Sequence, residues 1–417
     1  MKKISLLLIG LMLILSGYSQ SNKKIDWDSD LDYIAKMLPE KHFNLFTVKS
    51  NDEYLNGIEN IRNNKSKLSD FEIAISLQQL IAGFGDSHTK VKWGQLIDQK
   101  QLLPLHLYWF NDGIYILHTT NENKDILGHQ LLSINNIEIK KIVNSLSTLI
   151  TVDNRALIKS SIPKLLPSVQ LLKYFGVVKN NKIELKLMNS KGETKLWNIK
   201  PDKMNRQNRI SFKPDSLALC FKNERIFFID YYQKEDGIYY VQYNKCSSSE
   251  RERMYGRKDA DEKPSINEFT TNVLKVLNTK PIKKFVFDMR FNTGGSSNQG
   301  TKLIEKISAI QKQKPEMKLY VVLGRHTFSA AIINAMDFKR LTDAVYLGEE
   351  TSGKPNHFGE LWDLKLPNSG ITVLYSTKYF KETDEEMNSL KPDVQLEPSF
   401  DDFRKGIDPV YDWIREQ

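Results

Sequence analysis

The chain has 417 residues, of which 40% are hydrophobic and 10% aromatic, as in ordinary globular proteins with a sizeable core. Its 60 lysines and arginines outnumber its 51 aspartates and glutamates, and the resulting net charge of +9 is spread along the chain. Dispersed lysines are typical of a solvated surface and point to no particular partner. The sequence contains no nucleic-acid-binding motif, no Cys/His cluster with zinc spacing and no Gly-rich phosphate loop, so it predicts no nucleic-acid partner and no metal.

The N-terminus has the pattern of a secretory signal peptide. A basic start, Met1-Lys2-Lys3, is followed by the apolar run Ile4–Leu15 and by the small and polar residues Ser16–Gln20. We therefore predict a signal peptide over residues 1–20 and an exported protein, periplasmic or extracellular. No later run approaches the ~20 apolar residues of a spanning helix, so we expect no transmembrane segment in the mature chain.

The mature chain divides into three stretches with different patterns. Residues 21–98 show helical periodicity, most clearly over residues 71–84, and predict an N-terminal helical segment. Residues 99–205 alternate apolar and polar side chains and predict a β-rich domain of short strands. In residues 206–417 strands and helices alternate, which favours a layered α/β core. Within this core we expect the polar stretch Ser247–Lys263 to be a mobile insertion.

Two cysteines, Cys220 and Cys246, lie beside strand-like sequence. In an oxidising compartment they could form a disulfide, but we favour the interpretation that both are small buried hydrophobic residues. Whether they pair is left open.

Ser329 is the candidate nucleophile, because it lies between a predicted strand and a predicted helix. The run Leu319–Leu323 is short, β-branched and aromatic, whereas Ala330–Arg340 has apolar residues at helical spacing. The serine then lies at a helix N-terminus, where free N–H groups and the helix dipole can stabilise an oxyanion. A serine at this position also suits a simple helix N-cap.

A second segment combines a strand with two glycines. The apolar run that ends at Asp288 is followed by Arg290, Asn292 and the pair Gly294-Gly295. Two glycines after a strand let backbone N–H groups approach a substrate closely, although they suit a tight turn equally well.

Two residues are candidate general bases. Lys354 lies in a loop after the predicted strand Ala344–Leu347, and a lysine can act as a base where burial or a neighbouring cation lowers its pKa. His88 follows a predicted helix and lies beside Ser87, and a histidine base needs a carboxylate or a hydroxyl to orient it. Each also has an ordinary interpretation, as a solvated loop lysine or as a histidine that caps helix carbonyls.

Together these segments resemble the peptidases of family S41, which are the tail-specific or C-terminal processing proteases and their tricorn-like relatives. The resemblance covers nearly the whole mature chain. The family motif Asp-Leu-Arg-x-Asn-x-Gly-Gly is matched by Asp288–Gly295, and Thr-x-Ser-Ala is matched by Thr327–Ala330. In the processing proteases the lysine of a Gly-Lys motif follows the serine at a separation of 25, as Lys354 follows Ser329 here.

The resemblance implies an α/β fold with a crotonase-like (ClpP/crotonase) core of ββα units, preceded by the helical segment and a PDZ-like β-rich middle domain. It implies an oxyanion hole formed by backbone N–H groups of Ala330 and of Gly294 or Gly295. We assign substrate binding to the polar residues of the first motif, which are Asp288, Arg290 and Asn292.

The sequence departs from the pattern of the processing proteases around both base candidates. Pro355 follows Lys354 where those proteases usually have glycine, and Asp86–Thr89 resembles the histidine motif of tricorn-like enzymes. Those enzymes use a serine, a histidine, a second serine and a glutamate. The resemblance then implies His88 as the base, with Ser87 as the serine beside it and Glu386 as the glutamate.

We therefore predict a serine endopeptidase that acts on polypeptides. Ser329 attacks the peptide carbonyl, Lys354 or His88 transfers the hydroxyl proton to the leaving amine, and water hydrolyses the acyl-enzyme. This chemistry needs no metal and no organic cofactor. The alternative is a non-catalytic protein that binds peptides or hydrophobic ligands on the same fold, since a fold does not establish an activity. The sequence does not predict the cleavage specificity or the oligomeric state.

Overall fold

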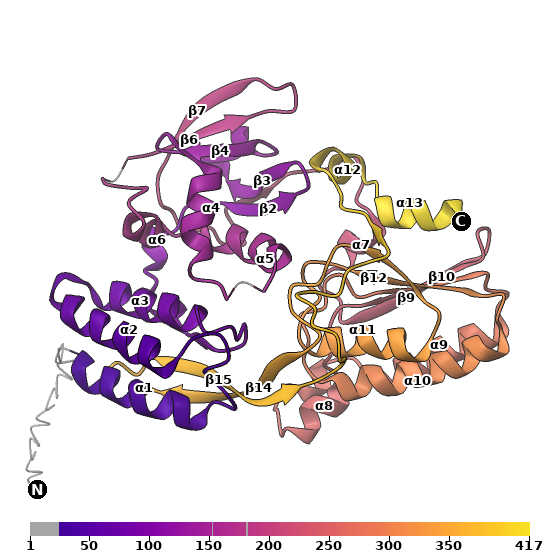
Figure 1. Cartoon of the computed structure of the whole chain (residues 1–417). Helices are drawn as coiled ribbons and strands as arrows, with labels where there is room; N and C mark the ends of the chain where they lie inside the picture. Colours follow the sequence, from indigo (N-terminus) through magenta and orange to yellow (C-terminus); the bar gives the residue numbers. More distant parts are fainter. Residues whose placement is uncertain (1–24, 152, 181) are drawn as a thin grey trace, which may run out of the picture.

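The computed structural model describes residues 25–151, 153–180 and 182–417, which form three units around a common centre (Figure 1). The predicted signal peptide, residues 1–20, lies outside the described residues. None of the described helices is long and apolar enough to cross a membrane.

The first unit is helical, as predicted, and is completed by a hairpin from much later in the chain. Its elements are α1 (Trp27–Lys41), α2 (Asn51–Asn64), α3 (Asp70–Ala82), β1 (Lys90–Val91), β14 (His357–Lys365) and β15 (Thr372–Phe380). Capping boxes begin α2 and α3, which satisfies N–H groups that lack helical partners. The sheet order is β1-β15-β14, and its apolar side chains share one core with the three helices. The division into consecutive stretches did not predict this hairpin.

The middle unit is an antiparallel sheet with helices. Its strands in spatial order are β2 (His106–Phe110), β3 (Gly113–Thr120), β4 (Gln130–Ile134), β6 (Ile183–Met188) and β7 (Thr194–Ile199), with β5 (Ile137–Glu138) on β4 and β8 (Arg209–Ser211) on β3. Its helices are α4 (Ile139–Ser147), α5 (Arg155–Leu165) and α6 (Val169–Tyr174). Strand β2 forms one edge of the sheet, and α5 packs beside it.

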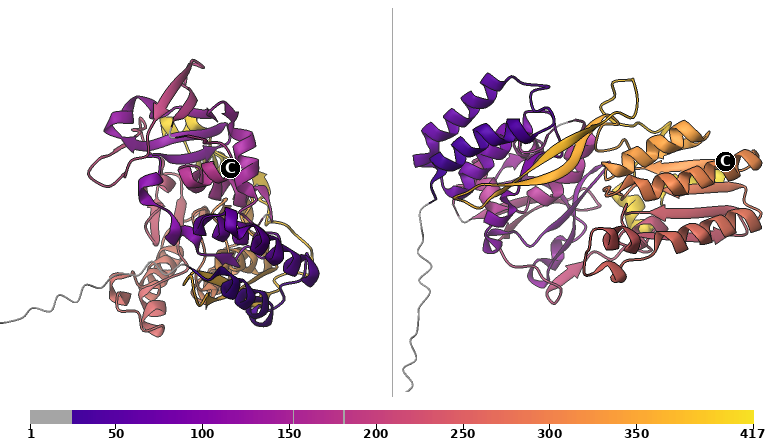
Figure 2. Two further views of the ribbon diagram at one scale, coloured as in Figure 1. Left: turned by 90° about the vertical axis from the view of Figure 1, so that its left-hand side faces the viewer. Right: turned by 90° about the horizontal axis from the view of Figure 1, so that it is seen from below.

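The core unit is a six-stranded sheet covered on both faces (Figure 2). Its strands in spatial order are β16 (Val394–Gln395), β13 (Val345–Gly348), β12 (Lys318–Leu323), β11 (Lys284–Asp288), β10 (Ile238–Tyr243) and β9 (Phe228–Gln233), and each pair is parallel except β9 with β10. Side chains alternate across a strand, so Phe285 and Phe287 pack against α9 (Ile266–Thr279), α10 (Ser297–Gln313) and α11 (Ala330–Leu341), whereas Val286 packs with α13 (Pro409–Glu416). The predicted α/β class is confirmed.

Three short helices complete the fold: α7 (Leu219–Lys222), α8 (Ser249–Met254) and α12 (Phe400–Lys405). Helix α8 occupies the stretch predicted to be a mobile insertion, and that prediction is wrong. Glu250 on α8 accepts hydrogen bonds from the backbone N–H groups of Ile266 and Asn267 at 3.1 and 3.2 Å, which fixes α8 to the N-terminus of α9. Helix α12 joins the core to the middle unit, because Phe400 stacks on Tyr115 with ring centroids 4.2 Å apart.

Candidate active site

Ser329 lies at a sharp turn between β12 and α11, as predicted. Its backbone has φ 56° and ψ −127°, a left-handed conformation that costs free energy for any residue other than glycine. Ser329 occupies the N-cap position of α11, yet its side chain makes no capping hydrogen bond. The simple cap interpretation is therefore wrong, and the half-buried hydroxyl is left for another interaction.

The Gly294-Gly295 turn lies directly against Ser329. A Cβ atom on Gly294 would lie 2.9 Å from Ser329 Cβ and 3.1 Å from Ala330 N, so both peptide segments meet at the hydroxyl. Gly294 has φ +93° and Gly295 has φ +140°, which explains the need for glycine at both positions. The Gly294 N–H donates to Asn292 Oδ1 at 2.9 Å. Gly295 N–H is thus the better partner of Ala330 N–H in an oxyanion hole.

We expect Gly294→Ala to lower peptidase turnover by about 10²–10³-fold, the cost of losing one oxyanion donor. The new methyl group would meet Phe328 O at 2.8 Å and displace the turn from Ser329. Steady-state turnover and a thermal melt of the same sample measure the effect. Gly192→Ala is the matched control, because Gly192 also has a positive φ, +82°, but has no other atom within 4 Å of the added Cβ. Equal losses in both variants would show that the crowding at Ser329 is irrelevant.

The three residues predicted to bind substrate are part of the support beneath this turn. Asp288 and Asn292 are 0% exposed and Arg290 is 9% exposed. Asn292 Nδ2 donates to Tyr243 O at 2.9 Å, while Arg290 binds the carboxylates of Asp288 and Asp408 at 2.8 and 3.0 Å. Side chains bound in this way hold the turn in place and do not reach a substrate. The substrate-binding assignment is therefore corrected to a positioning role.

We expect Arg290→Met to lower the free energy of unfolding by about 3–5 kcal/mol, since removing one partner leaves buried charge uncompensated. Denaturant unfolding followed by circular dichroism measures it. Arg404→Met is the control, because Arg404 pairs with Asp401 and Asp215 at the surface, and we expect no measurable change there. Equal stability of the Arg290 variant and the wild type would contradict a supporting role.

His88 lies in a stack of four rings that begins at the nucleophile turn. Its ring stacks on Phe328 with centroids 4.5 Å apart and on His357 at 5.5 Å, and His357 stacks on Phe380 at 5.4 Å. Phe328 immediately precedes Ser329, so the stack links His88 to the Ser329 turn. Both ring nitrogens of His88 are buried and have no hydrogen-bond partner among the described residues. Burial lowers the pKa of His88 to about 4, which leaves the ring neutral and able to accept a proton at pH 7.

Asp86 fixes the segment that carries His88. Its carboxylate accepts hydrogen bonds from His42 Nε2 at 3.0 Å, Ser376 Oγ at 2.6 Å and the backbone N–H of His88 at 2.8 Å. Burial alone would raise the pKa of Asp86, but the hydrogen bond from His42 and its other contacts lower it to about 2. Asp86 Oδ1 is 3.9 Å from His88 Nδ1, too far for a hydrogen bond but near enough to stabilise an imidazolium.

Lys354 forms an ion pair with a carboxylate. Its Nζ lies 3.1 Å from Asp153 Oδ1. Burial raises the pKa of Asp153, and Lys354 opposes that shift. The Lys354 ammonium group is thus engaged in an ion pair with Asp153. The stacking of His88 on Phe328 and the ion pair of Lys354 are the two observations that bear on the choice of base.

The loop of Lys354 nevertheless packs on the nucleophile turn. The Ser352 N–H donates to Thr327 O at 3.1 Å. A Cβ atom on Gly353 would lie 2.9 Å from the ring of Phe328. These contacts show that the Gly-Lys segment and the Ser329 turn are neighbours in space.

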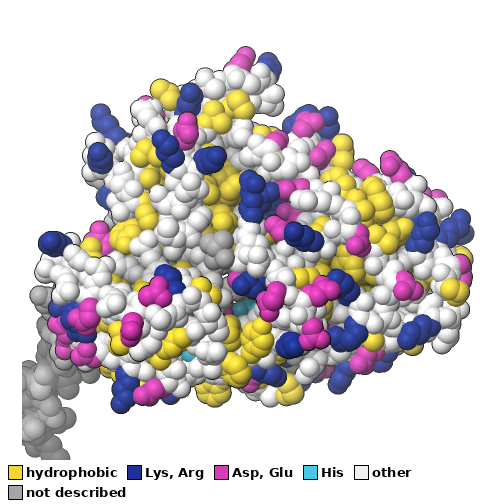
Figure 3. All heavy atoms as spheres, viewed as in Figure 1, with side chains coloured by type: hydrophobic (Ala, Val, Ile, Leu, Met, Phe, Trp, Pro, Cys, Tyr) yellow, Lys and Arg dark blue, Asp and Glu magenta, His cyan; other side chains and the backbone are white. Residues whose placement is uncertain are grey.

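Two cavities lie beside the segment that carries His88, and their walls include three of the predicted site residues. One, of about 450 Å³, is lined by Ser87, Lys354 and the exposed Glu386. The other, of about 340 Å³, is lined by Ser87 and Phe328 together with Thr293 and Ser352. Ser87 therefore lies where the two cavities meet. Figure 3 shows histidine side chains in the hollow between the helical unit and the core.

Within the described residues, no group of three or more His, Cys, Asp or Glu side chains is placed to hold a metal ion. Cys220 and Cys246 are both buried and unpaired with each other. A serine, a buried imidazole and two backbone N–H groups near one turn are components of acyl-transfer chemistry.

Comparison with known proteins shows a similarity in fold to solved structures. No protein-family model and no curated protein matches the chain. Mature CPAF complexed with lactacystin matches 93% of this chain and 97% of its own, with 13% identity and a TM-score of 0.64. A CPAF point mutant matches 93% of this chain and 96% of its own, with 14% identity and a TM-score of 0.62. The chain has the CPAF fold.

The likeness to CPAF supports the recognition of a family S41 peptidase fold in the sequence. At 93% coverage the CPAF fold includes all three units and not the core alone. At 13% identity the likeness to CPAF shows the fold alone.

Proposed function

We propose that the chain is a serine endopeptidase of the S41 type, with a crotonase-like core and a PDZ-like middle domain. The observation that carries the proposal is the convergence at Ser329, where a strained turn, a diglycine and a histidine stack meet. A strained backbone held by its surroundings often marks a functional site. Each component also has a role in acyl transfer.

In the proposed mechanism Ser329 Oγ attacks the carbonyl carbon of a peptide bond while His88 accepts the hydroxyl proton. The N–H groups of Ala330 and Gly295 stabilise the oxyanion. His88 then gives its proton to the leaving amine as the carbon–nitrogen bond breaks. Water, deprotonated by His88, hydrolyses the ester on Ser329 and restores the hydroxyl.

The residues around this centre have supporting roles in the proposal. Asp86 stabilises the imidazolium form of His88 by its charge, at 3.9 Å. Ser87 faces both cavities and Glu386 lies at the rim of one of them, so both can contact a polypeptide that passes from one cavity to the other. Lys354 keeps Asp153 paired.

Covalent labelling tests the proposal directly. A fluorophosphonate probe reacts with activated serines, so the mature protein should gain one adduct, located by mass spectrometry on the peptide that contains Ser329. Heat-unfolded protein is the control and should not react. The same preparation should release fragments from an unstructured polypeptide. The absence of both adduct and fragments would refute the proposal.

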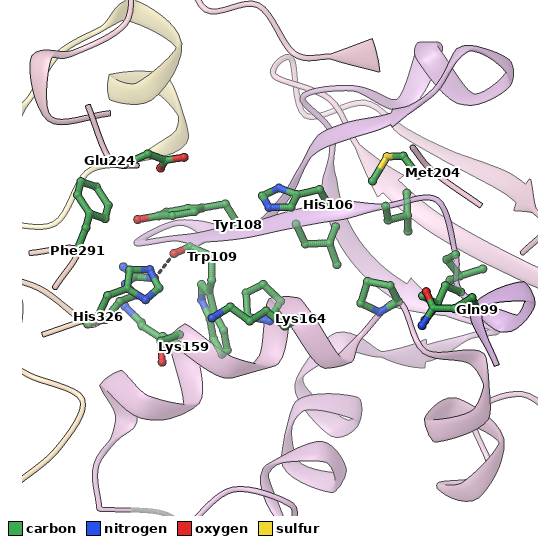
Figure 4. Close-up of a pocket in the computed structure, with 18 of the residues that line it drawn as sticks. Gln99, His106, Tyr108, Trp109, Lys159, Lys164, Met204, Glu224, Phe291 and His326 are labelled. Atoms are coloured by element: carbon green, nitrogen blue, oxygen red, sulfur yellow. Dashed lines mark hydrogen bonds between the residues drawn. The ribbon is translucent and has the colours of Figure 1, made fainter. Parts of the chain in front are cut away.

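The second candidate is a non-catalytic binding protein on the same fold. It is favoured by a third cavity of about 410 Å³ between β2 and α5, whose walls include Leu103, Leu105 and Leu107 (Figure 4). Such a pocket beside an edge strand can hold an extended peptide without cleaving it. A binding protein would hold a polypeptide unchanged whether or not residue 329 has a hydroxyl.

A further inference from the structure

The cavity between β2 and α5 and the cavity beside the nucleophile turn form one continuous groove, because Ser160, Lys164 and His326 line both. Figure 4 shows Lys164 on the α5 side of the groove and His326 at the end nearest the core. A polypeptide that extends from β2 to the turn at Phe328 must therefore pass Lys164.

The part of the groove beside the nucleophile turn is positively charged. Lys90 and Lys164 line it, and none of its lining residues is acidic. Two neighbouring lysines have ion-pair partners, since Lys92 binds Asp363 and Lys159 binds Glu397. Within the described residues neither Lys90 nor Lys164 forms such a pair. The two ammonium groups are therefore available to attract an anionic group of a ligand that binds in the groove.

The surroundings keep these two charges uncompensated. Desolvation lowers the pKa of Lys90, and the charge of Lys164 lowers it further. Desolvation also lowers the pKa of Lys164, and burial together with Lys164 lowers that of His326. The charge of Asp86 raises the pKa of Lys90. The carboxylate oxygens of Asp86, however, already accept hydrogen bonds from His42, Ser376 and the backbone of His88. A carboxylate brought by a ligand would relieve this mutual repulsion.

We propose that Lys90 and Lys164 form a site for acidic side chains of the polypeptide substrate, so that the protein selects chains with Asp or Glu close to the cleaved bond. This inference rests on the proposed function and names the substrate class for the same groove. Lys90 on β1 and Lys164 on α5 belong to different units, so an acidic segment bound here would contact both.

Peptide binding without catalysis tests the proposal. Three fluorescein-labelled 12-residue peptides with blocked ends carry Glu, Gln or Lys at every third position in one Ala/Val/Gly background, and fluorescence anisotropy measures their affinity for the Ser329→Ala variant. We expect the Glu peptide to bind about tenfold more tightly than the Gln peptide at low salt, as two partly exposed ion pairs permit. The difference should shrink towards one at 0.5 M salt, because screening weakens exposed charge pairs.

Substitution of the two lysines tests whether they cause the preference for the Glu peptide. In Lys90→Gln/Lys164→Gln the ratio of Glu-peptide to Gln-peptide affinity should fall to about one. Lys191→Gln is the matched control, because Lys191 is exposed in the turn between β6 and β7, and its ratio should remain about tenfold. The groove partly desolvates both ammonium groups, but both residues are solvent-exposed as a whole, so the double variant should fold, as circular dichroism would verify.

The outcomes separate this inference from the proposed function. Equal affinity for Glu and Gln peptides, or a ratio unchanged in the double variant, would overturn the acidic-site inference even if the wild type cleaves peptides. A Glu preference without any cleavage by the wild type would support the inference and refute the peptidase. A second Gln peptide with a free C-terminus completes the set; if it binds as tightly as the blocked Glu peptide, a terminal carboxylate is the ligand and the role of acidic side chains is overturned.

Discussion

Ser329→Ala is expected to abolish peptide hydrolysis, with a loss in turnover on the order of 10⁴–10⁶-fold. The hydroxyl is the only part of residue 329 that the mechanism uses, and alanine keeps the Cβ atom and the backbone. Fragment release from an unstructured polypeptide, followed by mass spectrometry, measures the loss. Because the Ser329 side chain makes no capping hydrogen bond, the variant should fold and melt like the wild type.

Ser329→Gly provides the companion measurement. Glycine adopts φ 56° without steric cost, so this variant should be equally inactive but more stable than Ser329→Ala, by about 1 kcal/mol. A thermal melt of both variants detects this difference. If Ser329→Gly is inactive and more stable than Ser329→Ala, the strained backbone at residue 329 lowers stability, and the hydroxyl at that position is required for activity. If Ser329→Ala still cleaved the polypeptide, the nucleophile would have to be another residue.

The sequence predicted the elements around the nucleophile because their signals are local. The β-branched run of β12 and the helical spacing of α11 were sufficient to place Ser329 at a strand-to-helix turn, and β11 and β12 pair in parallel register, which brings Gly294 to the same edge of the sheet. The diglycine and the Lys354 segment both contact the Ser329 turn in the structure, a convergence that the sequence alone did not predict.

The sequence could not predict what surrounds His88. Its neighbours come from three distant segments, with His42 after α1, His357 on β14 and Ser376 on β15, and no local pattern relates them. The roles of the Asp288 motif were wrong for a different reason. A motif shows which residues occur together, whereas only burial distinguishes a side chain that contacts a substrate from one that supports a turn, such as Arg290 with its partner Asp408.

His88→Phe is expected to lower turnover by about 10²–10⁴-fold, the usual contribution of a general base. Phenylalanine keeps a ring between Phe328 and His357 but accepts no proton. His357→Phe is the matched control, since it preserves the stack and removes an imidazole whose Nδ1 lies 2.9 Å from Pro355 O. Steady-state turnover of one polypeptide by the two variants measures both effects, and equal losses would show that the effect is not specific to His88 and would contradict its role as the base.

The same turnover measurement distinguishes His88 from Lys354 as the general base. Lys354→Arg keeps a cation beside Asp153 but supplies no base, because a guanidinium stays protonated, so this variant should retain most of the turnover. A loss as large as that of His88→Phe would make Lys354 the base.

The dependence of turnover on pH gives an independent answer. Only neutral His88 accepts the proton, and its pKa is lowered by burial to about 4. The value of kcat/KM should therefore increase as the pH rises through about 4 and remain level at neutral pH. A lysine base would instead place the increase at alkaline pH, because the ammonium must first lose its proton. His88→Phe should abolish the increase near pH 4, whereas Lys354→Arg should leave it in place.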